Sequence, residues 1–184
     1  MFTPVVQWLI IANVVMFFGE PYLPRAWAGY MALWPVGTFF EPWQLVTYAF
    51  LHGSLDHLFF NMLGLFVFGN DLERVWGGRR LLNCYLLSVI TAGITQLIFA
   101  ASTGAQEPTV GASGGVFGLL LAFAMVFPNR RLMLIFPPIP MSSRTLAIGY
   151  GAIELALGVT GTQAGVAHFA HLGGMLGAWL YLSF

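Results

Sequence analysis

The stretch Ser113-Gly-Gly-Val-Phe-Gly-Leu-Leu-Leu-Ala-Phe-Ala-Met-Val-Phe127 is apolar, carries no charge and has a serine at its first position. A helix that spans a membrane needs about 20 mostly apolar residues, so these 15 residues make a short span. We expect a short helix that begins below one membrane surface. A helix of that kind leaves room for water above its serine.

Further stretches of the chain are long and apolar enough to cross a bilayer. With residues 113–127 they predict an all-α, polytopic membrane protein of six transmembrane helices, organised as one domain over residues 1–184. The first stretch lacks a basic leader and a small-residue cleavage site, so we expect it to remain as the first span. The five other stretches are 2–18, 57–76, 81–101, 145–161 and 166–184.

The overall composition supports the membrane interpretation. Hydrophobic residues make up 58% of the chain and charged residues 8%, whereas soluble domains carry about 25% charged residues. A soluble enzyme is therefore excluded. The net charge is +0 and all seven basic residues are scattered arginines, which excludes a nucleic-acid binder. The single cysteine, Cys84, excludes a disulfide framework and a cysteine-based zinc site.

The arginines indicate how the chain is oriented, because loops on the cytoplasmic side of a membrane are enriched in basic residues. Only Arg25 lies in the links on one side of the predicted bundle. The distribution predicts that both termini are cytoplasmic. Six arginines flank the links on the opposite side: Arg74, Arg79, Arg80, Arg130, Arg131 and Arg144.

The segment between the first and second spans is neither a span nor a simple loop. Residues 22–45 are interrupted by Pro24, Pro35 and Pro42 and are rich in aromatic side chains. Aromatic rings with a polar edge favour the headgroup region of a bilayer. We expect a structured, membrane-associated loop that is partly sunk in the outer leaflet.

Three polar residues are predicted to lie at one depth, a few ångströms beneath the outer surface. Ser113 stands 17 residues before Arg130, and Asn61 stands 18 residues before Arg79. At 1.5 Å per residue these spacings are about 26 Å and about 27 Å. His171 opens the sixth span in the same way, so the three residues share one layer.

This layer contains the components of a hydrolase. A serine hydroxyl needs an adjacent base to become a nucleophile, and histidine is the usual base. His57 and Asn61 are four residues apart, share one helical face and are candidate oxyanion donors, together with the amide of Gly114 at a helix start. Two glycine faces, Gly114/Gly118 and Gly173/Gly177, would let the helices approach closely.

Three motifs on this frame resemble the rhomboid intramembrane serine proteases. They are Gly-Ala-Ser-Gly at 111–114, His57-Leu-Phe-Phe-Asn61, and Ala-His-Leu-Gly-Gly-Met-Leu-Gly at 170–177. Residues 42–69 and 72–93 also look like rhomboid sequence, so the resemblance covers nearly the whole chain.

The resemblance implies a serine endopeptidase with a Ser113–His171 dyad, oxyanion donors His57 and Asn61, and no cofactor or metal. It implies that the substrates are single-span membrane proteins. The compact six-span form is similar to the bacterial type, which implies a bacterial inner membrane. Two positions depart from the family pattern: Gln44 stands where many relatives have Arg, and Phe117 replaces a frequent Tyr while still able to stack on His171.

Two further polar residues compete for a place in the site. His168 lies one turn before His171, and we expect it to be a hydrogen-bonding residue on the loop side. Glu154 lies in the fifth span, and its position along the helix places it well below the layer of His171. We therefore expect Glu154 to be a structural acid and not a third catalytic residue.

Two other classes of protein stay open. The first is a metal-binding membrane protein, because His52, His57, His168 and His171 all lie toward the outer side, although no recognisable ligand motif accompanies them. The second is an inactive rhomboid relative that binds client proteins, against which the presence of both Ser113 and His171 argues.

Overall fold

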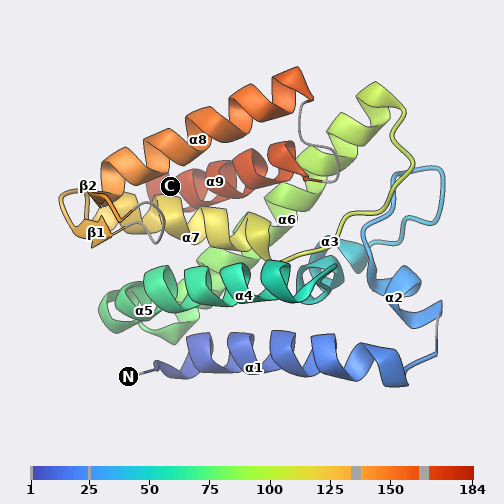
Figure 1. Ribbon diagram of the computed structural model, residues 1–184, viewed down its shortest axis with the longest axis horizontal. Coiled ribbons are helices and arrows are strands. Elements are labelled where there is room, and N and C mark those ends of the chain that lie inside the picture. The colour runs from blue at the N-terminus through green and yellow to red at the C-terminus, as the bar shows by residue number, and fades with distance from the viewer. Residues whose placement is uncertain (1, 25, 134–137, 162–165) are drawn as a thin grey trace.

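Short apolar stretches separated by glycine- and proline-containing links give a mostly helical chain (Figure 1). The computed structural model describes residues 2–24, 26–133, 138–161 and 166–184. Its elements are α1 (Pro4–Gly19), η1 (Glu20–Tyr22), α2 (Ala26–Met31), α3 (Gln44–Thr47), η2 (Tyr48–Phe50), α4 (Leu55–Gly64), η3 (Leu65–Gly69), α5 (Asn70–Trp76), α6 (Gly78–Thr103), α7 (Ser113–Val126), β1 (Arg131–Met133), β2 (Pro140–Ser142), α8 (Ser143–Thr160) and α9 (His168–Ser183).

The longer helices lie side by side and alternate in direction along the chain (Figure 1). α9 packs against α6 and α7 at the centre, α8 covers α7 and α9, and α1 contacts the continuous segment α4–η3–α5. The helices begin and end within a few residues of the predicted stretches, so the helical fold class is confirmed. Among the described residues, Pro4–Tyr22 and Gly78–Thr103 are long and apolar enough to cross a membrane, and Ser113–Val126 is apolar but shorter.

The link between α7 and α8 differs from the all-α prediction. β1 and β2 form an antiparallel pair in which Leu132 lies opposite Met141. The hairpin also holds the start of α8 in place. The backbone N–H of Ser143, the first residue of α8, donates to the carbonyl of Arg130 at 2.9 Å. The strands are three residues each, so a period-two pattern is too short to recognise in the sequence.

Glycines bring the central helices into contact, with one difference from the prediction. Gly114 of α7 meets Gly174 of α9, where an added Cβ would overlap the Gly114 carbonyl. Gly173 and Gly177 instead face Thr95 and Thr91 of α6. The predicted pair Gly173/Gly177 therefore joins α9 to α6, and the neighbouring Gly174 joins α9 to α7.

The first loop is structured, as expected, and Gln44 anchors it. The Gln44 side chain is 1% exposed; its amide donates to the carbonyls of Tyr30 and Phe39, and its Oε1 accepts the Trp34 N–H. A pair of backbone hydrogen bonds joins Leu33 to Thr109 in the segment before α7. The loop is thus tied directly to the backbone that leads to Ser113.

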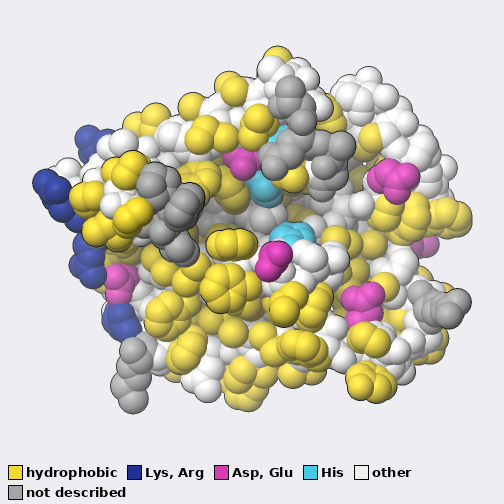
Figure 2. All heavy atoms as spheres, viewed as in Figure 1, with side chains coloured by type: hydrophobic (Ala, Val, Ile, Leu, Met, Phe, Trp, Pro, Cys, Tyr) yellow, Lys and Arg dark blue, Asp and Glu magenta, His cyan; other side chains and the backbone are white. Residues whose placement is uncertain are grey.

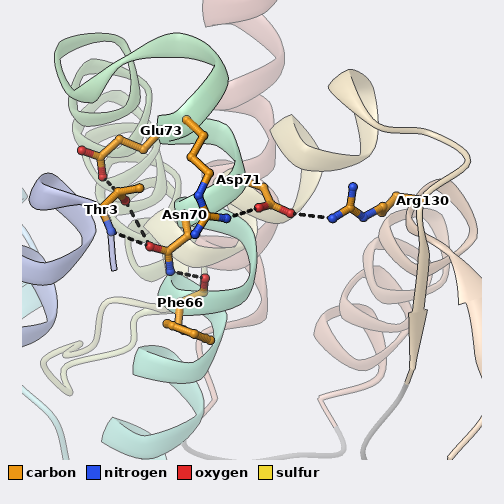
Figure 3. Close-up of polar contacts among 7 residues, drawn as sticks. Thr3, Phe66, Asn70, Asp71, Glu73 and Arg130 are labelled. Atoms are coloured by element: carbon orange, nitrogen blue, oxygen red, sulfur yellow. Dashed lines mark hydrogen bonds and ion pairs between the residues drawn. The ribbon is translucent and has the colours of Figure 1, made fainter. Parts of the chain in front are cut away.

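A buried carboxylate fixes the opposite end of the bundle (Figure 3). Glu73 accepts the N–H groups of Val5 and Val6 at 2.9 and 3.0 Å and the hydroxyl of Thr3. These N–H groups belong to the first turn of α1 and have no partner within their own helix. Glu73 therefore caps α1 from α5.

The surface separates charged from apolar side chains (Figure 2). Arginine side chains gather at one end of the molecule, and yellow apolar side chains cover much of the visible face. Large apolar residues on several helices point outward, for example Trp8, Ile98, Ile148 and Val159, each at least 66% exposed. Exposed apolar area on this scale is typical of a surface that contacts lipid.

Candidate active site

Ser113 is the first residue of α7, and the preceding backbone holds it in place. Gly111 has a φ of +127°, which favours glycine, and its N–H donates to the Tyr48 carbonyl at 2.9 Å. A Cβ at Gly111 would lie 2.7 Å from Nε2 of His57. Only glycine at this position allows the His57 ring to approach the turn before Ser113.

His171 contacts Ser113 from the first turn of α9. Its Nε2 lies 2.8 Å from the Ser113 Oγ, at hydrogen-bond distance. The imidazole is stacked on Phe117 with ring centroids 4.3 Å apart and ring planes 2° apart. Stacking and burial leave the imidazole little freedom to turn away from the hydroxyl, and the expected contact between Phe117 and His171 is present.

A cavity of about 630 Å³ contains Ser113, His171, His57 and Asn61 together. The cavity is therefore lined by both the predicted nucleophile–base pair and the two predicted oxyanion side chains. Gln96 also lines it, with a buried Oε1 that has no hydrogen-bond partner within the described part of the protein. Histidine side chains are visible from this face of the molecule (Figure 2).

The predicted oxyanion donors differ in their hydrogen bonds and in whether they line the cavity. His57 lies in the first turn of α4, where Ser54 caps the helix by accepting the His57 N–H. The Asn61 amide donates to the His57 carbonyl at 2.8 Å, which leaves its second N–H for another acceptor. Gly114 is buried in the first turn of α7 and is not among the residues that line the cavity.

His52 lies just outside α4 and packs against His57, with ring centroids 5.0 Å apart. Its side chain is buried. Burial and, to a smaller extent, the neighbouring His57 together lower the pKa of His52 to about 4. His52 is thus a neutral packing partner that supports the position of His57.

The prediction for Glu154 was wrong in its depth. Glu154 is 7% exposed, and its Oε2 lies 2.7 Å from Nδ1 of His168 and 2.9 Å from Nδ1 of His171. At the rise per residue of an α-helix, Glu154 lies about 9 Å from the end of α8, and His171 lies about 4.5 Å from the start of α9. The two side chains are long enough to span the difference between these depths. An acidic residue inside an apolar stretch was the available signal.

His168 is a hydrogen-bonding residue, as predicted, but it is buried between helices and does not lie on the loop side. It is 5% exposed and forms a hydrogen bond with Glu154 across the interface of α8 and α9. Glu154, His168 and His171 form a cluster that has the residue types of a metal site. His52 and His57 are not part of that cluster, so the four histidines do not converge on one point.

Residues 40–184 match the Rhomboid domain family. Over 140 residues the chain is 32% identical to Rhomboid protease GluP of Bacillus subtilis (strain 168), covering 76% of this chain and 25% of the relative. Over 178 residues it is 31% identical to the human Presenilin-associated rhomboid-like protein, mitochondrial, covering 93% of this chain and 46% of the relative. Over 141 residues it is 36% identical to RHOMBOID-like protein 4 of Arabidopsis thaliana, covering 76% and 33%. The chain spans less than half the length of each of these relatives.

Proposed function

Because this chain belongs to the rhomboid family, we propose that it is an intramembrane serine protease that hydrolyses peptide bonds in or near transmembrane segments of membrane proteins. The observation that carries the proposal is the 2.8 Å contact between Ser113 Oγ and His171 Nε2 in a cavity that also contains His57 and Asn61. One of the similar proteins, Rhomboid protease GluP, is named as a protease, which adds support.

In the proposed reaction Ser113 is the nucleophile and His171 the general base. Nε2 takes the hydroxyl proton while Oγ attacks the carbonyl carbon of the scissile peptide. The imidazolium then gives this proton to the leaving amine, and the C–N bond breaks to leave an acyl enzyme. Water from the cavity, deprotonated by His171, attacks the ester, and the proton returns to Ser113 when the acid product leaves.

The negative oxygen that forms in each step needs donors that are already in place. We assign this role to His57, to the free N–H of Asn61, and to the backbone amide of Gly114 in the first turn of α7. The amides of a helix start lack internal partners and favour an anion. The side-chain donors come from α4, so the oxyanion site joins α4 to α7.

We propose that the six helical segments α1, α4–η3–α5, α6, α7, α8 and α9 each span the membrane, as one catalytic domain over residues 1–184. The arginine-rich end would face the cytoplasm, together with both termini. The cavity would then open near the outer surface. The family is membrane-embedded and includes mitochondrial relatives, so the bacterial inner membrane stays a prediction.

An apolar groove of about 510 Å³ runs between α4 and α8. Phe60, Val116 and Phe117 line both this groove and the cavity. We propose that a single transmembrane segment of the substrate enters here from the lipid and that α8, which contributes Leu146 and Tyr150 to the groove, moves to admit it.

The test is cleavage of a single-span reporter by the purified chain in liposomes, with parallel labelling by a fluorophosphonate. The proposal requires cleavage and labelling by the wild type and neither by Ser113→Ala. Cleavage by Ser113→Ala at more than a few per cent of the wild-type rate contradicts the assignment of the nucleophile.

A metal-binding membrane protein is the second candidate, because Glu154, His168 and His171 lie together. It predicts that a chelator removes the activity and that a divalent ion restores it. The serine protease predicts an activity that resists chelators and is lost to the fluorophosphonate. An inactive client-binding relative would show neither cleavage nor labelling.

A further inference from the structure

Glu154 lies on the far side of the His171 ring from Ser113. Its Oε2 is 2.9 Å from His171 Nδ1, while His171 Nε2 is 2.8 Å from Ser113 Oγ. The carboxylate comes from α8, the imidazole from α9 and the hydroxyl from α7. Three helices therefore place a carboxylate, an imidazole and a hydroxyl in sequence, although no two of these residues are neighbours in the chain.

The carboxylate is shared between two histidines in an unequal way. Its contact with His168 Nδ1, at 2.7 Å, is a hydrogen bond. Its contact with His171 has ion-pair distance, but Nδ1 of His171 is not aligned for a hydrogen bond. Hydrogen bonds between catalytic groups are often misaligned in the absence of substrate and tighten once substrate is bound.

A carboxylate at Nδ1 matters because an imidazole has two tautomers. An acceptor beside Nδ1 favours the proton on that nitrogen, which leaves the lone pair of Nε2 directed at Ser113. The same negative charge stabilises the imidazolium that forms when Nε2 takes the serine proton. Stacking on Phe117 fixes the plane of the ring, but it does not select between the two tautomers.

The distances fit proton-sharing groups better than metal ligands. Two ligands of a tetrahedral zinc ion, with bonds of about 2.0–2.1 Å, lie about 3.3 Å apart. Oε2 is nearer than that to both ring nitrogens, at 2.7 and 2.9 Å. In addition, Nε2 of His171 already contacts Ser113, so the ring is committed to the hydroxyl.

We propose that Glu154 is a positioning residue that extends the Ser113–His171 pair to a three-residue unit. It holds His171 in the tautomer that accepts the serine proton. The inference rests on the function proposed above. It also has a consequence for motion: the unit is complete only while α8 packs against α9, so α8 must return to this position after substrate entry before the serine reacts.

The decisive variant is Glu154→Gln, which keeps the size of the side chain but removes its charge. Its amide can donate to Nδ1 and so favours the wrong tautomer of His171. We expect kcat for a single-span reporter in liposomes to fall by about 10²- to 10⁴-fold, with KM changed less than about threefold. The rate of fluorophosphonate labelling of Ser113 should fall in parallel, and the melting temperature in detergent should change little.

His168→Ala is the matched control, because it removes the other partner of the same carboxylate. We expect it to retain kcat within about tenfold of the wild type. A value of kcat for Glu154→Gln within about threefold of the wild type overturns the inference. Equal losses of kcat and of melting temperature in the two variants also overturn it, because they indicate a purely structural tie between α8 and α9.

A measurement on the wild-type chain keeps the inference testable if Glu154→Gln does not fold. The ¹⁵N signals of the His171 ring, identified by their absence from His171→Gln, should report a proton on Nδ1. A proton on Nε2 instead contradicts the inference. Ser113→Ala separates the two proposals: if it is inactive while Glu154→Gln is fully active, only the role of Glu154 fails, and if it stays active the protease assignment fails.

Discussion

Two buried glutamates stand at opposite ends of this bundle and have different partners. Glu73 is 6% exposed and Glu154 is 7% exposed. Glu73 accepts two backbone N–H groups and the hydroxyl of Thr3 at the start of α1; the contact with Thr3 is drawn in Figure 3. Glu154 contacts the Nδ1 atoms of two imidazole rings. Burial and residue type are therefore the same, and the partners distinguish the two sites.

The difference lies in what the partners can do. Backbone amides keep their protons, so the carboxylate of Glu73 can only hold α1 in place. Imidazoles gain and lose protons near neutral pH, so the carboxylate of Glu154 can influence a proton transfer. A buried acid in a membrane helix is a functional candidate by default, but the comparison indicates that its partners decide between structure and chemistry.

The largest effect on cleavage is expected from a change to His171, the proposed base, which contacts Glu154. His171→Ala should lower cleavage of a single-span reporter by about 10³-fold or more, and the double variant with Ser113→Ala should lose little beyond that, because the two residues act as a unit. Turnover in liposomes is the measurement. If His168→Ala proved inactive while His171→Ala stayed active, the base would be His168.

The next effect concerns the movement of the helix that carries Glu154. A bismaleimide link between Phe60→Cys on α4 and Tyr150→Cys on α8, which line the same groove, should lower cleavage of the membrane substrate by about tenfold or more. Labelling of Ser113 by a small water-borne fluorophosphonate should persist. The same double variant before linking is the control, and unchanged cleavage after linking would show that substrate enters elsewhere.

At the other end, Glu73→Gln should act on stability alone. The loss of charge weakens three hydrogen bonds at the start of α1, which corresponds to about 1–3 kcal/mol, and it should lower the melting temperature in detergent. Asp71→Asn, two residues away on the same helix, is the matched control. The ion pairs of Asp71 with Arg74 and Arg130 lie at the surface and contribute about 0–1 kcal/mol. A large fall in kcat for Glu73→Gln would remove the contrast between the two glutamates.

The smallest effect concerns His52, beside the proposed oxyanion donor. Its pKa in the folded protein is about 4, below the value of about 6.5 expected for an unfolded chain. The unfolded state therefore binds the proton first, and this contribution to stability is present above pH 6.5 and is lost as the pH falls toward 4. His52→Leu should make the melting temperature depend less on pH over this range. An unchanged pH dependence would indicate that other groups titrate there.

Much of the fold was predictable because apolar stretches and proline positions act locally. The helix boundaries follow the apolar stretches, and the aromatic segment between α1 and α4 is a structured loop. The β1–β2 hairpin was missed, since its strands are too short to carry a pattern. The interruption of the second predicted span by the π-turn of η3 was missed as well, because nothing in its apolar sequence distinguishes one helical hydrogen-bond pattern from another.

For the candidate site, the sequence by itself determined the residue types and their heights. Ser113 at the start of a short helix, His171 at the start of the last one and Asn61 in the second span were predicted to share a layer, because each height is counted along a single helix at a fixed rise. In the structure all three line one cavity. The same counting failed for Glu154, because it gives a position along a helix axis but not the displacement of α8 relative to α9.

Only the tertiary structure decided how the helices face and slide against one another. It placed Gly174, and not Gly173, against Gly114, and it brought Oε2 of Glu154 to 2.9 Å from His171. Rotation about a helix axis and displacement along it depend on the packing of all neighbouring side chains. Residue spacing along one helix carries no information about them, so the carboxylate's place beside the histidine was settled by the packing of α8 on α9.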